Sequence, residues 1–417
     1  METAARQPIH TVYGGAHLFR ADSAGKLGAL ALRALEEYAP DPETFAAAIG
    51  LPGGQMPSVI YRRVLEKLQR EPVEDFRIDF EDGYGSRPDA EEDGHAQTAG
   101  REVAEGLASG SLPPFVGIRI KPLTEELEGR AVRTLEGFMS SLVEGAGALP
   151  DDFVVTLPKV TSPGQVATLA ELLGRLEKEL GLEPASIRVE IMVETPQAVI
   201  GPSGEAAPPA LVEAGKGRVV GAHFGTYDYT ASLGITASHQ HMTHPVCDFA
   251  RHVMQVSLAG RGVRLSDGAT NILPVPVHSG PRLTDRQREE NRRAVHRAWK
   301  LHFDDIRHSL MHGYYQGWDL HPAQLPTRYG AVYAFFLEGV EAAAERLHTF
   351  VEQAARATLV REVFDDAATG QGLLNYFLRA LNSGAVGEEE VMMRTGLTPE
   401  ELRGRSFLKI LENRRSA

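Results

Sequence analysis

The chain has 417 residues, of which 42% are hydrophobic and 24% are charged, a composition typical of soluble globular proteins with a large core. Lys and Arg total 43 against 56 Asp and Glu, and the net charge of −13 argues against an extended nucleic-acid-binding surface. Cys247 is the only cysteine, which excludes intrachain disulfides and metal sites built from several cysteines.

The first residues, Met1-Glu-Thr-Ala-Ala-Arg6, do not combine a basic segment with an apolar one, as a secretory signal would. No apolar stretch reaches the roughly 18 residues that a membrane span requires. We therefore expect a cytoplasmic protein, with neither membranes nor nucleic acids among its partners.

Eight short runs rich in apolar and β-forming residues recur along the chain, and most are separated by helical patterns. This alternation predicts parallel strands joined by crossover helices. Eight such units favour a closed (β/α)8 TIM barrel over an open doubly wound sheet, which remains the alternative. The predicted strands are residues 9–13, 76–80, 115–120, 153–157, 187–193, 219–224, 263–265 and 317–320.

Capping residues mark the starts of several helices. Ser162-Pro-Gly-Gln165 combines a cap, a first-turn proline and the glutamine of a capping box, and Thr284-Asp-Arg-Gln287 also has the two box residues. We expect another helix to begin at Thr124. The residues predicted to face inward are Leu169, Leu172, Leu173, Leu176 and Leu180 after Ser162, and Leu127, Ala131, Leu135, Phe138 and Leu142 after Thr124.

Long connections and a helical carboxyl-terminal part are added to this plan. Residues 201–217, 236–246 and 274–283 exceed ordinary loop lengths and predict lids or interfaces. From Tyr329 onward the pattern is helical only. The last predicted helix starts with the capping box Thr398-Pro-Glu-Glu401 and places Leu402, Phe407, Leu408 and Leu411 inward. We therefore predict a barrel domain over residues 1–334 and a helical extension over residues 335–417.

The segment Phe76-Arg-Ile-Asp-Phe-Glu-Asp-Gly83 indicates a buried strand with Asp79, Glu81 and Asp82 at its carboxyl end. Burying carboxylates without a cation, hydrogen bonds or an open cleft has a large desolvation cost, so this cluster indicates a site. A solvated loop is the alternative, because Asp and Gly are also common turn residues.

Two further acids follow apolar strands: Glu194 comes directly after residues 187–193, and Asp228 comes shortly after residues 219–224. The carboxyl ends of barrel strands meet at one mouth, where two carboxylates repel each other unless a cation joins them. An oxygen-only pair suits Mg²⁺, which keeps positions free for water and substrate oxygens. Taken alone, each acid could instead cap or start a helix.

Arg119 and Lys159 would direct cations at the same mouth. Arg119 lies inside an apolar strand, where an unpaired guanidinium is costly, so it should meet a carboxylate of the substrate or of the protein. A structural ion pair with Glu81 is the alternative. Lys159 would define a different aldolase class if it formed a Schiff base, but the strand-end acids favour an enolate stabilised by a metal.

These motifs occur in the order found in the HpcH/HpaI aldolase and citrate lyase β-subunit-like family, which the chain resembles. The match is similar to the citrate lyase and malyl-CoA lyase branch and covers roughly residues 9–334, with six motifs at (β/α) spacing. The matching segments are Asp79-Phe-Glu-Asp82, Arg119, Leu157-Pro-Lys159, Val193-Glu-Thr195, Phe224-Gly-Thr-Tyr-Asp228 with Leu233-Gly234, and His321-Pro-Ala-Gln324.

The resemblance implies a TIM-barrel enzyme that makes or breaks carbon–carbon bonds through an enolate with the help of a divalent metal. By position, Glu194 and Asp228 would hold Mg²⁺, with Mn²⁺ as a substitute. Arg119 would bind the substrate carboxylate or the carbonyl oxygen on which negative charge develops.

The same resemblance assigns supporting roles. Asp79, Glu81 and Asp82 would orient Arg119, hold water near the metal or move a proton, with Asp82 as the candidate base. A base from a neighbouring subunit is the alternative. His321 and Gln324 would shape the substrate site, with a plain loop turn as their alternative. Family members are often trimeric or hexameric, so a homo-oligomer is expected.

The chain also departs from the family pattern. Gly225-Thr-Tyr-Asp-Tyr229 stands where the familiar pattern is closer to Gly-x-Glu-Asp-Leu, and the chain is longer than a typical citrate lyase β-subunit, which leaves the substrate open. The insertion His239-Gln-His-Met-Thr-His244, followed by Cys247 and Asp248, invites a zinc hypothesis. We instead predict that His241, His244 and Asp248 share a helix face and serve capping, packing or a substrate contact. Asp267 is a further candidate for the mouth.

From the acids and the arginine on successive strands we expect a Mg²⁺-dependent carbon–carbon lyase or aldolase. It would cleave a 3-hydroxy acid or its CoA thioester into an oxo acid and an acetyl-type or pyruvate-type enolate partner. A non-catalytic barrel that binds a carboxylic acid or CoA ester, and a thioester hydrolase, are the alternatives. The substrate, the use of CoA, the direction of the reaction, the catalytic base and the role of the histidine-rich insertion remain open.

Overall fold

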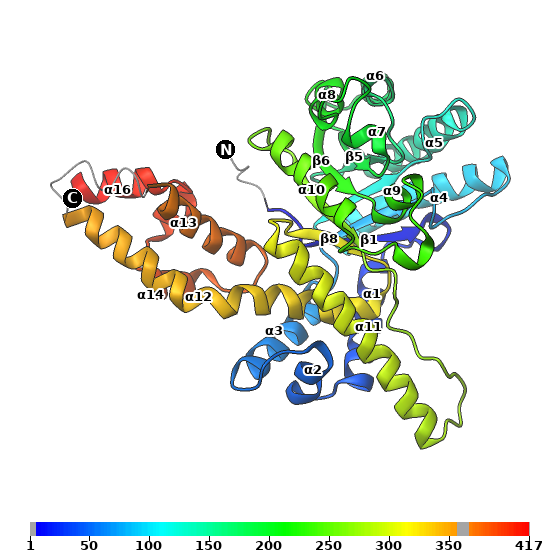
Figure 1. Ribbon diagram of the computed structural model, residues 1–417. Helices are drawn as coiled ribbons and strands as arrows, with labels where there is room; N and C mark the ends of the chain where they lie inside the picture. Colours follow the sequence, from blue (N-terminus) through cyan, green and yellow to red (C-terminus); the bar gives the residue numbers. More distant parts are fainter. Residues whose placement is uncertain (1–5, 357–366, 417) are drawn as a thin grey trace.

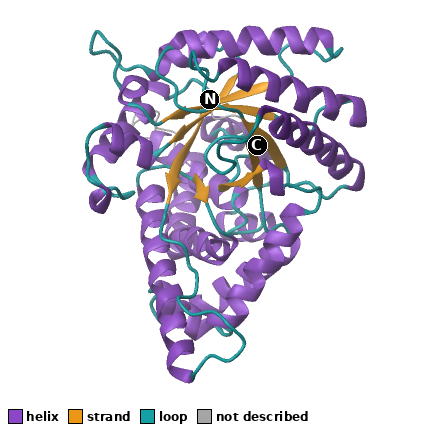
Figure 2. Cartoon of the chain, turned by 90° about the vertical axis from the view of Figure 1, so that its right-hand side faces the viewer, coloured by secondary structure: helices purple, strands orange, loops and turns teal. Residues whose placement is uncertain are grey.

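The computed structural model describes residues 6–356 and 367–416. Eight parallel strands close into a barrel in chain order, and helices surround them (Figure 2). The predicted (β/α)8 TIM barrel with a helical carboxyl-terminal extension is confirmed. The strands are β1 (His10–Gly15), β2 (Asp75–Asp79), β3 (Phe115–Arg119), β4 (Val154–Leu157), β5 (Arg188–Val193), β6 (Val219–Phe224), β7 (Arg264–Ala269) and β8 (Gln316–Asp319).

Strand alternation places a polar layer inside the barrel. Asp75, Arg77 and Asp79 alternate along β2 and therefore face the same side. Arg77 pairs with Asp75 and donates to Glu190 through Nη2 at 2.8 Å, while His223 Nε2 lies 3.3 Å from Glu190. Because these buried charges have partners, the barrel avoids the large cost of isolated ions in its interior.

The helices begin where their capping residues predicted, with one exception. The capping boxes at Ser162, Thr284 and Thr398 are all present. The helix α5 begins at Glu128 rather than at Thr124, because the N–H groups of Leu127 and Glu128 both bond to the Thr124 carbonyl in a turn that precedes it. The residues predicted to face inward after Ser162 and after Thr124 are buried, apart from Leu127 and Leu180, which are partly exposed.

Helices connect the strands of the barrel and follow β8. The helical elements are η1 (Ala16–Leu18), α1 (Ser23–Tyr38), α2 (Pro42–Ile49), α3 (Met56–Arg70), α4 (Asp89–Ser109), α5 (Glu128–Ala146), α6 (Pro163–Glu179), α7 (Pro196–Val199), α8 (Pro208–Ala214), α9 (Thr226–Ser232), η2 (Ala237–His239), α10 (Pro245–Leu258), α11 (Asp285–Met311), η3 (Pro322–Gln324), α12 (Leu325–Arg356), α13 (Ala367–Asn382), α14 (Glu388–Thr395), α15 (Pro399–Gly404) and α16 (Phe407–Ser416). None of these described helices is long and apolar enough to cross a membrane.

The helix α12 connects the barrel to the carboxyl-terminal helices (Figure 1). It contacts α3 and α11 on the barrel side and α13, α14 and α16 on the other, and it runs without a break through the predicted boundary between residues 334 and 335. The last predicted helix is instead two, because Arg405 adopts a left-handed φ of 51° and ends α15. Leu402, Phe407 and Leu411 are buried, whereas Leu408 is 51% exposed, so its predicted inward position is wrong.

Candidate active site

The predicted functional side chains follow β2 to β6 at the carboxyl ends of the strands. Asp79 and Arg119 are the last residues of β2 and β3 and are paired in the sheet register. Lys159 follows β4, Glu194 follows β5, and Asp228 lies in the first turn of α9 after β6. Because all barrel strands are parallel, these ends surround one mouth.

Arg119 is held by Asp79 in a buried bidentate pair. The guanidinium donates from Nε and Nη2 to the two Asp79 oxygens at 2.7 and 2.6 Å. Asp79 also accepts the N–H groups of Glu81 at 2.9 Å and Gly83 at 2.7 Å. Burial alone would lower the pKa of Arg119, but the charge and hydrogen bonds of Asp79 raise it above its usual value. Asp79 therefore fixes both the guanidinium and the loop that carries the next two acids.

The Lys159 ammonium lies among three acids of the mouth. Its Nζ bonds to Glu81 and lies 3.4 Å from the Asp82 carboxylate and 3.5 Å from Asp228 Oδ2. Burial would lower the pKa of Lys159, but the hydrogen bond and charge of Glu81 raise it. A Schiff-base lysine must lose its proton, so this environment disfavours that role.

Glu81 and Asp82 differ in their ability to hold a proton. Glu81 lies 3.2 Å from Arg119 Nη1, and burial raises its pKa although Arg119 and Lys159 act in the opposite direction. Asp82 is 61% exposed. Partial burial would raise the pKa of Asp82, but Lys159 and Arg119 lower it below its usual value. Of the two acids, Glu81 is therefore better suited to proton transfer near neutral pH.

Glu194 is a buried carboxylate without an ion-pair partner among the described residues. Its Oε1 accepts the Lys159 backbone N–H at 2.6 Å. Burial and the nearby charge of Asp228 raise the pKa of Glu194 to about 7. A Cβ atom added to Gly225 would lie 2.5 Å from Glu194 Oε2, so the carboxylate is packed tightly against this glycine.

The donors at this position fit a hard divalent cation. An ion between Glu194 and Asp228 would offset both the buried charge and the repulsion between the two acids. The Asp228 carboxylate is 45% exposed, which gives an ion a path from solvent. Across the described residues, no three acids of the mouth approach within 4.8 Å of one another.

His321 and Gln324 shape the loop after β8. His321 Nδ1 accepts the Ala323 N–H at 3.1 Å, and burial lowers the pKa of His321. Gln324 is fully buried, accepts the N–H groups of Leu320 and His321 at 2.8 and 3.1 Å, and donates to the Thr270 carbonyl at 3.0 Å. Both side-chain polar atoms are thus bonded within the protein, and these bonds hold the loop after β8 in place.

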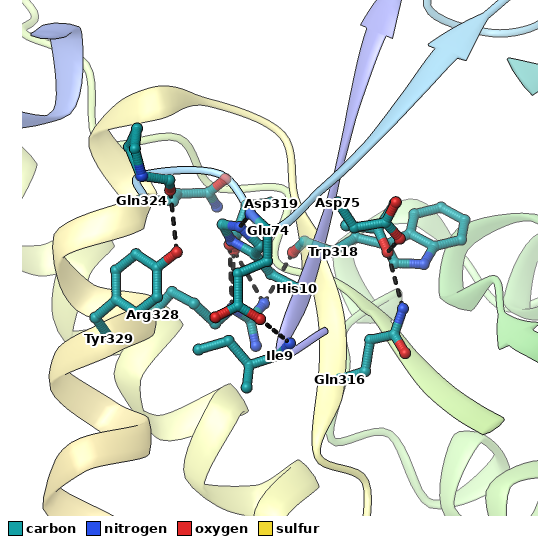
Figure 3. Close-up of polar contacts among 12 residues, drawn as sticks. Ile9, His10, Glu74, Asp75, Gln316, Trp318, Asp319, Gln324, Arg328 and Tyr329 are labelled. Atoms are coloured by element: carbon teal, nitrogen blue, oxygen red, sulfur yellow. Dashed lines mark hydrogen bonds and ion pairs between the residues drawn. The ribbon is translucent and has the colours of Figure 1, made fainter. Parts of the chain in front are cut away.

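Asp319, the last residue of β8, anchors this side of the barrel. Figure 3 shows its contacts with His10 at 2.7 Å and Arg328 at 2.9 Å. His302 Nε2 lies 3.0 Å from Asp319 Oδ1, the oxygen that also accepts from Arg328 Nη2. Burial would raise the pKa of Asp319, but Arg328 and the histidines hold it well below its usual value. The cluster ties β1 and β8 to α11 and α12.

Residues that no sequence motif predicted contact Arg119 from inside the barrel. The Tyr13 ring centroid lies 4.7 Å from the guanidinium, and Met192 Sδ lies 3.6 Å from Nη1. Tyr13 also contacts Trp318 and lies 3.3 Å from His223 Nδ1 through its hydroxyl. Strands that are buried on both faces lack an alternating pattern, so no local signal marked these residues.

Asp267 does not face the mouth, contrary to prediction. It lies within β7, which extends to Ala269 rather than ending at residue 265. Its carboxylate accepts two hydrogen bonds from Arg251 at 2.9 and 3.1 Å and one from Ser309 at 2.6 Å. The side chain therefore points outward to α10 and α11.

The predicted helix face shared by His241, His244 and Asp248 is also wrong. The helix α10 begins at Pro245, so both histidines precede it. The expected capping role is confirmed for His244, whose Nδ1 accepts the Val246 N–H at 3.2 Å.

Several solved structures are similar to this chain at low sequence identity. A citrate lyase from Burkholderia xenovorans LB400 is 16% identical, with 94% of this chain and 96% of that chain covered and a TM-score of 0.58. A malate synthase from Haloferax volcanii is 15% identical over 100% and 99% of the two chains, with a TM-score of 0.49. An HpcH/HpaI aldolase/citrate lyase family protein from Burkholderia cenocepacia J2315 is 12% identical over 82% and 95%, with a TM-score of 0.40.

The citrate lyase comparison establishes a shared fold and, at this identity, nothing finer. No curated protein sequence matches the chain significantly. A family model described as "Domain of unknown function (DUF6986)" matches residues 1–410. The chain belongs to this family.

Proposed function

We propose that this protein is a carbon–carbon lyase or aldolase that depends on a divalent metal and acts through an enolate on a hydroxy or oxo acid or its CoA thioester. The observation that carries the proposal is the convergence of Arg119, Glu194 and Asp228 at one barrel mouth. The motifs that resemble the citrate lyase and malyl-CoA lyase branch support it, as does the fold shared with a protein described as a citrate lyase. A homo-oligomer and a cytoplasmic location remain predictions.

Asp79 leaves one edge of the Arg119 guanidinium for a second anion. It accepts from Nε and Nη2, whereas Nη1 lies 3.2 Å from Glu81 Oε2 and 3.6 Å from Met192 Sδ. This edge of the guanidinium would bind the substrate carboxylate or the oxygen on which enolate charge develops. Mg²⁺ or Mn²⁺ held by Glu194 and Asp228 would polarise the carbonyl group of the substrate.

Glu81 and Lys159 complete the proposed site. Glu81, with its raised pKa and its position beside Arg119, is our candidate for moving the proton of the enolate partner. Lys159 remains an ammonium that keeps Glu81, Asp82 and Asp228 together. Because Nζ lies 3.5 Å from Asp228, this ammonium should shift when a divalent ion binds there.

The pKa of Glu194 near 7 predicts a pH dependence of metal binding. Below this pH the carboxyl is protonated, and Mg²⁺ must displace the proton. The affinity should then fall about tenfold per pH unit below 7 and level off above it. Calorimetric titrations with Mg²⁺ at pH 6 and 8, in buffers of different ionisation enthalpy, should show proton release only at pH 6. An affinity that does not change with pH would contradict this assignment.

Replacing Gly225 with Ala should weaken Mg²⁺ binding while the fold persists. The added Cβ would lie 2.5 Å from the Cβ and Oε2 atoms of Glu194, so the carboxylate must move. Gly129→Ala is a matched control, because a Cβ at this position of α5 meets nothing within 4 Å. We expect calorimetry to show at least about a tenfold loss of affinity for the first variant and none for the control. Equal affinities would show that the packing of Glu194 is unimportant.

Exchange of α-protons with solvent tests the proposed function. With Mg²⁺, the purified protein should exchange α-protons of pyruvate, acetyl-CoA or propionyl-CoA for deuterium in D₂O, followed by NMR. Binding of one of these compounds without exchange would overturn the lyase proposal and favour a non-catalytic barrel. Thioester hydrolysis without exchange would favour a hydrolase.

A further inference from the structure

Three metal-ligating side chains meet on the outside of the barrel, away from the mouth. Asp248 lies in the first turn of α10, His308 lies in the last turn of α11, and His312 caps the end of α11. One carboxylate oxygen and two imidazole nitrogens lie within 4.8 Å of one another, and all three residues are partly exposed. The spacing of four residues puts both histidines on one helix face, with ring centroids 4.3 Å apart.

The hydrogen bond of His312 favours metal coordination. Its Nδ1 lies 2.8 Å from the His308 carbonyl oxygen. A carbonyl can only accept, so Nδ1 carries the proton and the neutral ring presents the Nε2 lone pair. Histidines that bind metals are commonly oriented by this kind of bond to a backbone carbonyl. His308 Nε2 lies 2.8 Å from Asp248 Oδ1, which brings the second imidazole to the carboxylate.

Arg251 is a positively charged side chain that contacts this group and would lie close to a bound metal ion. Its Nη2 donates to Asp248 Oδ1 at 2.6 Å and lies 3.4 Å from His308 Nε2. Its Nη1 donates to Oδ1 of the buried Asp267 at 2.9 Å, so the negative charge of Asp267 neutralises the positive charge of the guanidinium. The contacts of Asp248 with Arg251 and His308 all use Oδ1. Oδ2 is therefore the oxygen that an ion would take.

We propose that Asp248, His308 and His312 form a second metal site, which takes Zn²⁺ or a similar transition-metal cation. Two imidazoles and one carboxylate suit such ions, whereas the oxygen-only mouth suits Mg²⁺. The ion fastens the start of α10 to the end of α11 and keeps its remaining coordination positions for water. This site is independent of the proposed function.

Zinc titration of the untagged full-length protein tests the site. The Glu194→Gln variant serves as the background, so that the mouth does not compete for the ion. We expect it to bind one Zn²⁺ per chain and to unfold at a higher temperature with Zn²⁺ than with EDTA. Adding His308→Asn and His312→Asn should remove both effects. Adding His239→Asn and His241→Asn, two exposed histidines of the insertion, should preserve them.

Either of two results would overturn the second site: no Zn²⁺ bound in the Glu194→Gln background, or full binding retained after both substitutions on α11. If the doubly substituted protein does not fold, Asp248→Asn in the same background replaces it. That variant keeps the size of the side chain and should weaken Zn²⁺ binding by at least about tenfold. Unchanged affinity in Asp248→Asn would also overturn the proposal.

Discussion

Replacing Glu194 with Gln is expected to reduce metal-dependent turnover by on the order of 10³-fold or more and to leave the fold intact. The amide retains the size of the side chain, but its neutral oxygen is a poor ligand for Mg²⁺. Glu194 is buried and lies directly after β5, so its loss would remove the more rigid of the two proposed ligands. The α-proton exchange assay measures this effect. Undiminished exchange would exclude Glu194 as a metal ligand.

The same variant has a stability effect that does not depend on catalysis. The pKa of Glu194 is raised to about 7, chiefly by burial and then by Asp228, so the folded state penalises the ionised form. Relative to an ordinary glutamate, its contribution is favourable at low pH and is lost as the pH rises through 7. Without metal, Glu194→Gln should therefore unfold at a higher temperature than the original protein at pH 8.5, and at a similar temperature at pH 5. The exposed control Glu183→Gln should change neither value.

Breaking the pair of Asp79 and Arg119 should have the largest effect on stability. Asp79→Asn leaves the buried guanidinium without its bidentate partner, and Arg119→Met leaves the buried carboxylate without its cation. Removing one partner of a buried pair typically costs about 3–5 kcal/mol. Each single variant should therefore lower the free energy of unfolding in urea by about this amount. Both should also abolish exchange, because the anion-binding edge is lost or misoriented.

The double variant separates this pair from two independent losses. Asp79→Asn with Arg119→Met removes both charges, so its cost should fall short of the sum of the single costs by about 1–3 kcal/mol. The exposed pair of Glu171 and Lys216, 3.2 Å apart, is the matched control, with an expected coupling below about 1 kcal/mol. Additive effects at Asp79 and Arg119 would show that the two side chains do not depend on each other.

Local sequence patterns were enough to predict the barrel and, apart from Asp267, which acids follow its strands at the mouth. Short apolar runs at regular spacing identified all eight strands, and their carboxyl ends placed Glu194 and Arg119 at one mouth. The partner of Arg119 could not be chosen in the same way. The sequence indicated Glu81 as a possible ion-pair partner and Asp79 as one of three acids that would orient Arg119. The register between β2 and β3 sets Asp79 opposite Arg119 and gives it the bidentate pair, while Glu81 Oε2 lies 3.2 Å from Nη1. Register depends on long-range strand pairing, which short motifs do not encode.

The histidines of the proposed second metal site also could not be predicted from short motifs. The zinc hypothesis from sequence rested on the His/Cys spacing of the insertion from His239 to His244 with Cys247 and Asp248. The structure instead brings Asp248 to His308 and His312, which follow it by some sixty residues. Packing of α10 near the end of α11 creates this group. Each helix contributes only part of the ligand set: α11 supplies two histidines four residues apart, and α10 supplies Asp248.

The assignment of Glu194 and Asp228 as metal ligands is tested by locating Mn²⁺ in crystals of the protein through its anomalous scattering. We expect an anomalous peak at the barrel mouth within coordination distance of one Glu194 oxygen and one Asp228 oxygen, with Lys159 Nζ moved away from Asp228. In crystals of Glu194→Gln the peak should be absent. No Mn²⁺ at the mouth, with Lys159 still in contact with Glu81 and Asp228, would contradict the assignment of these acids as the metal site, whether or not Mn²⁺ occupies the group of Asp248, His308 and His312.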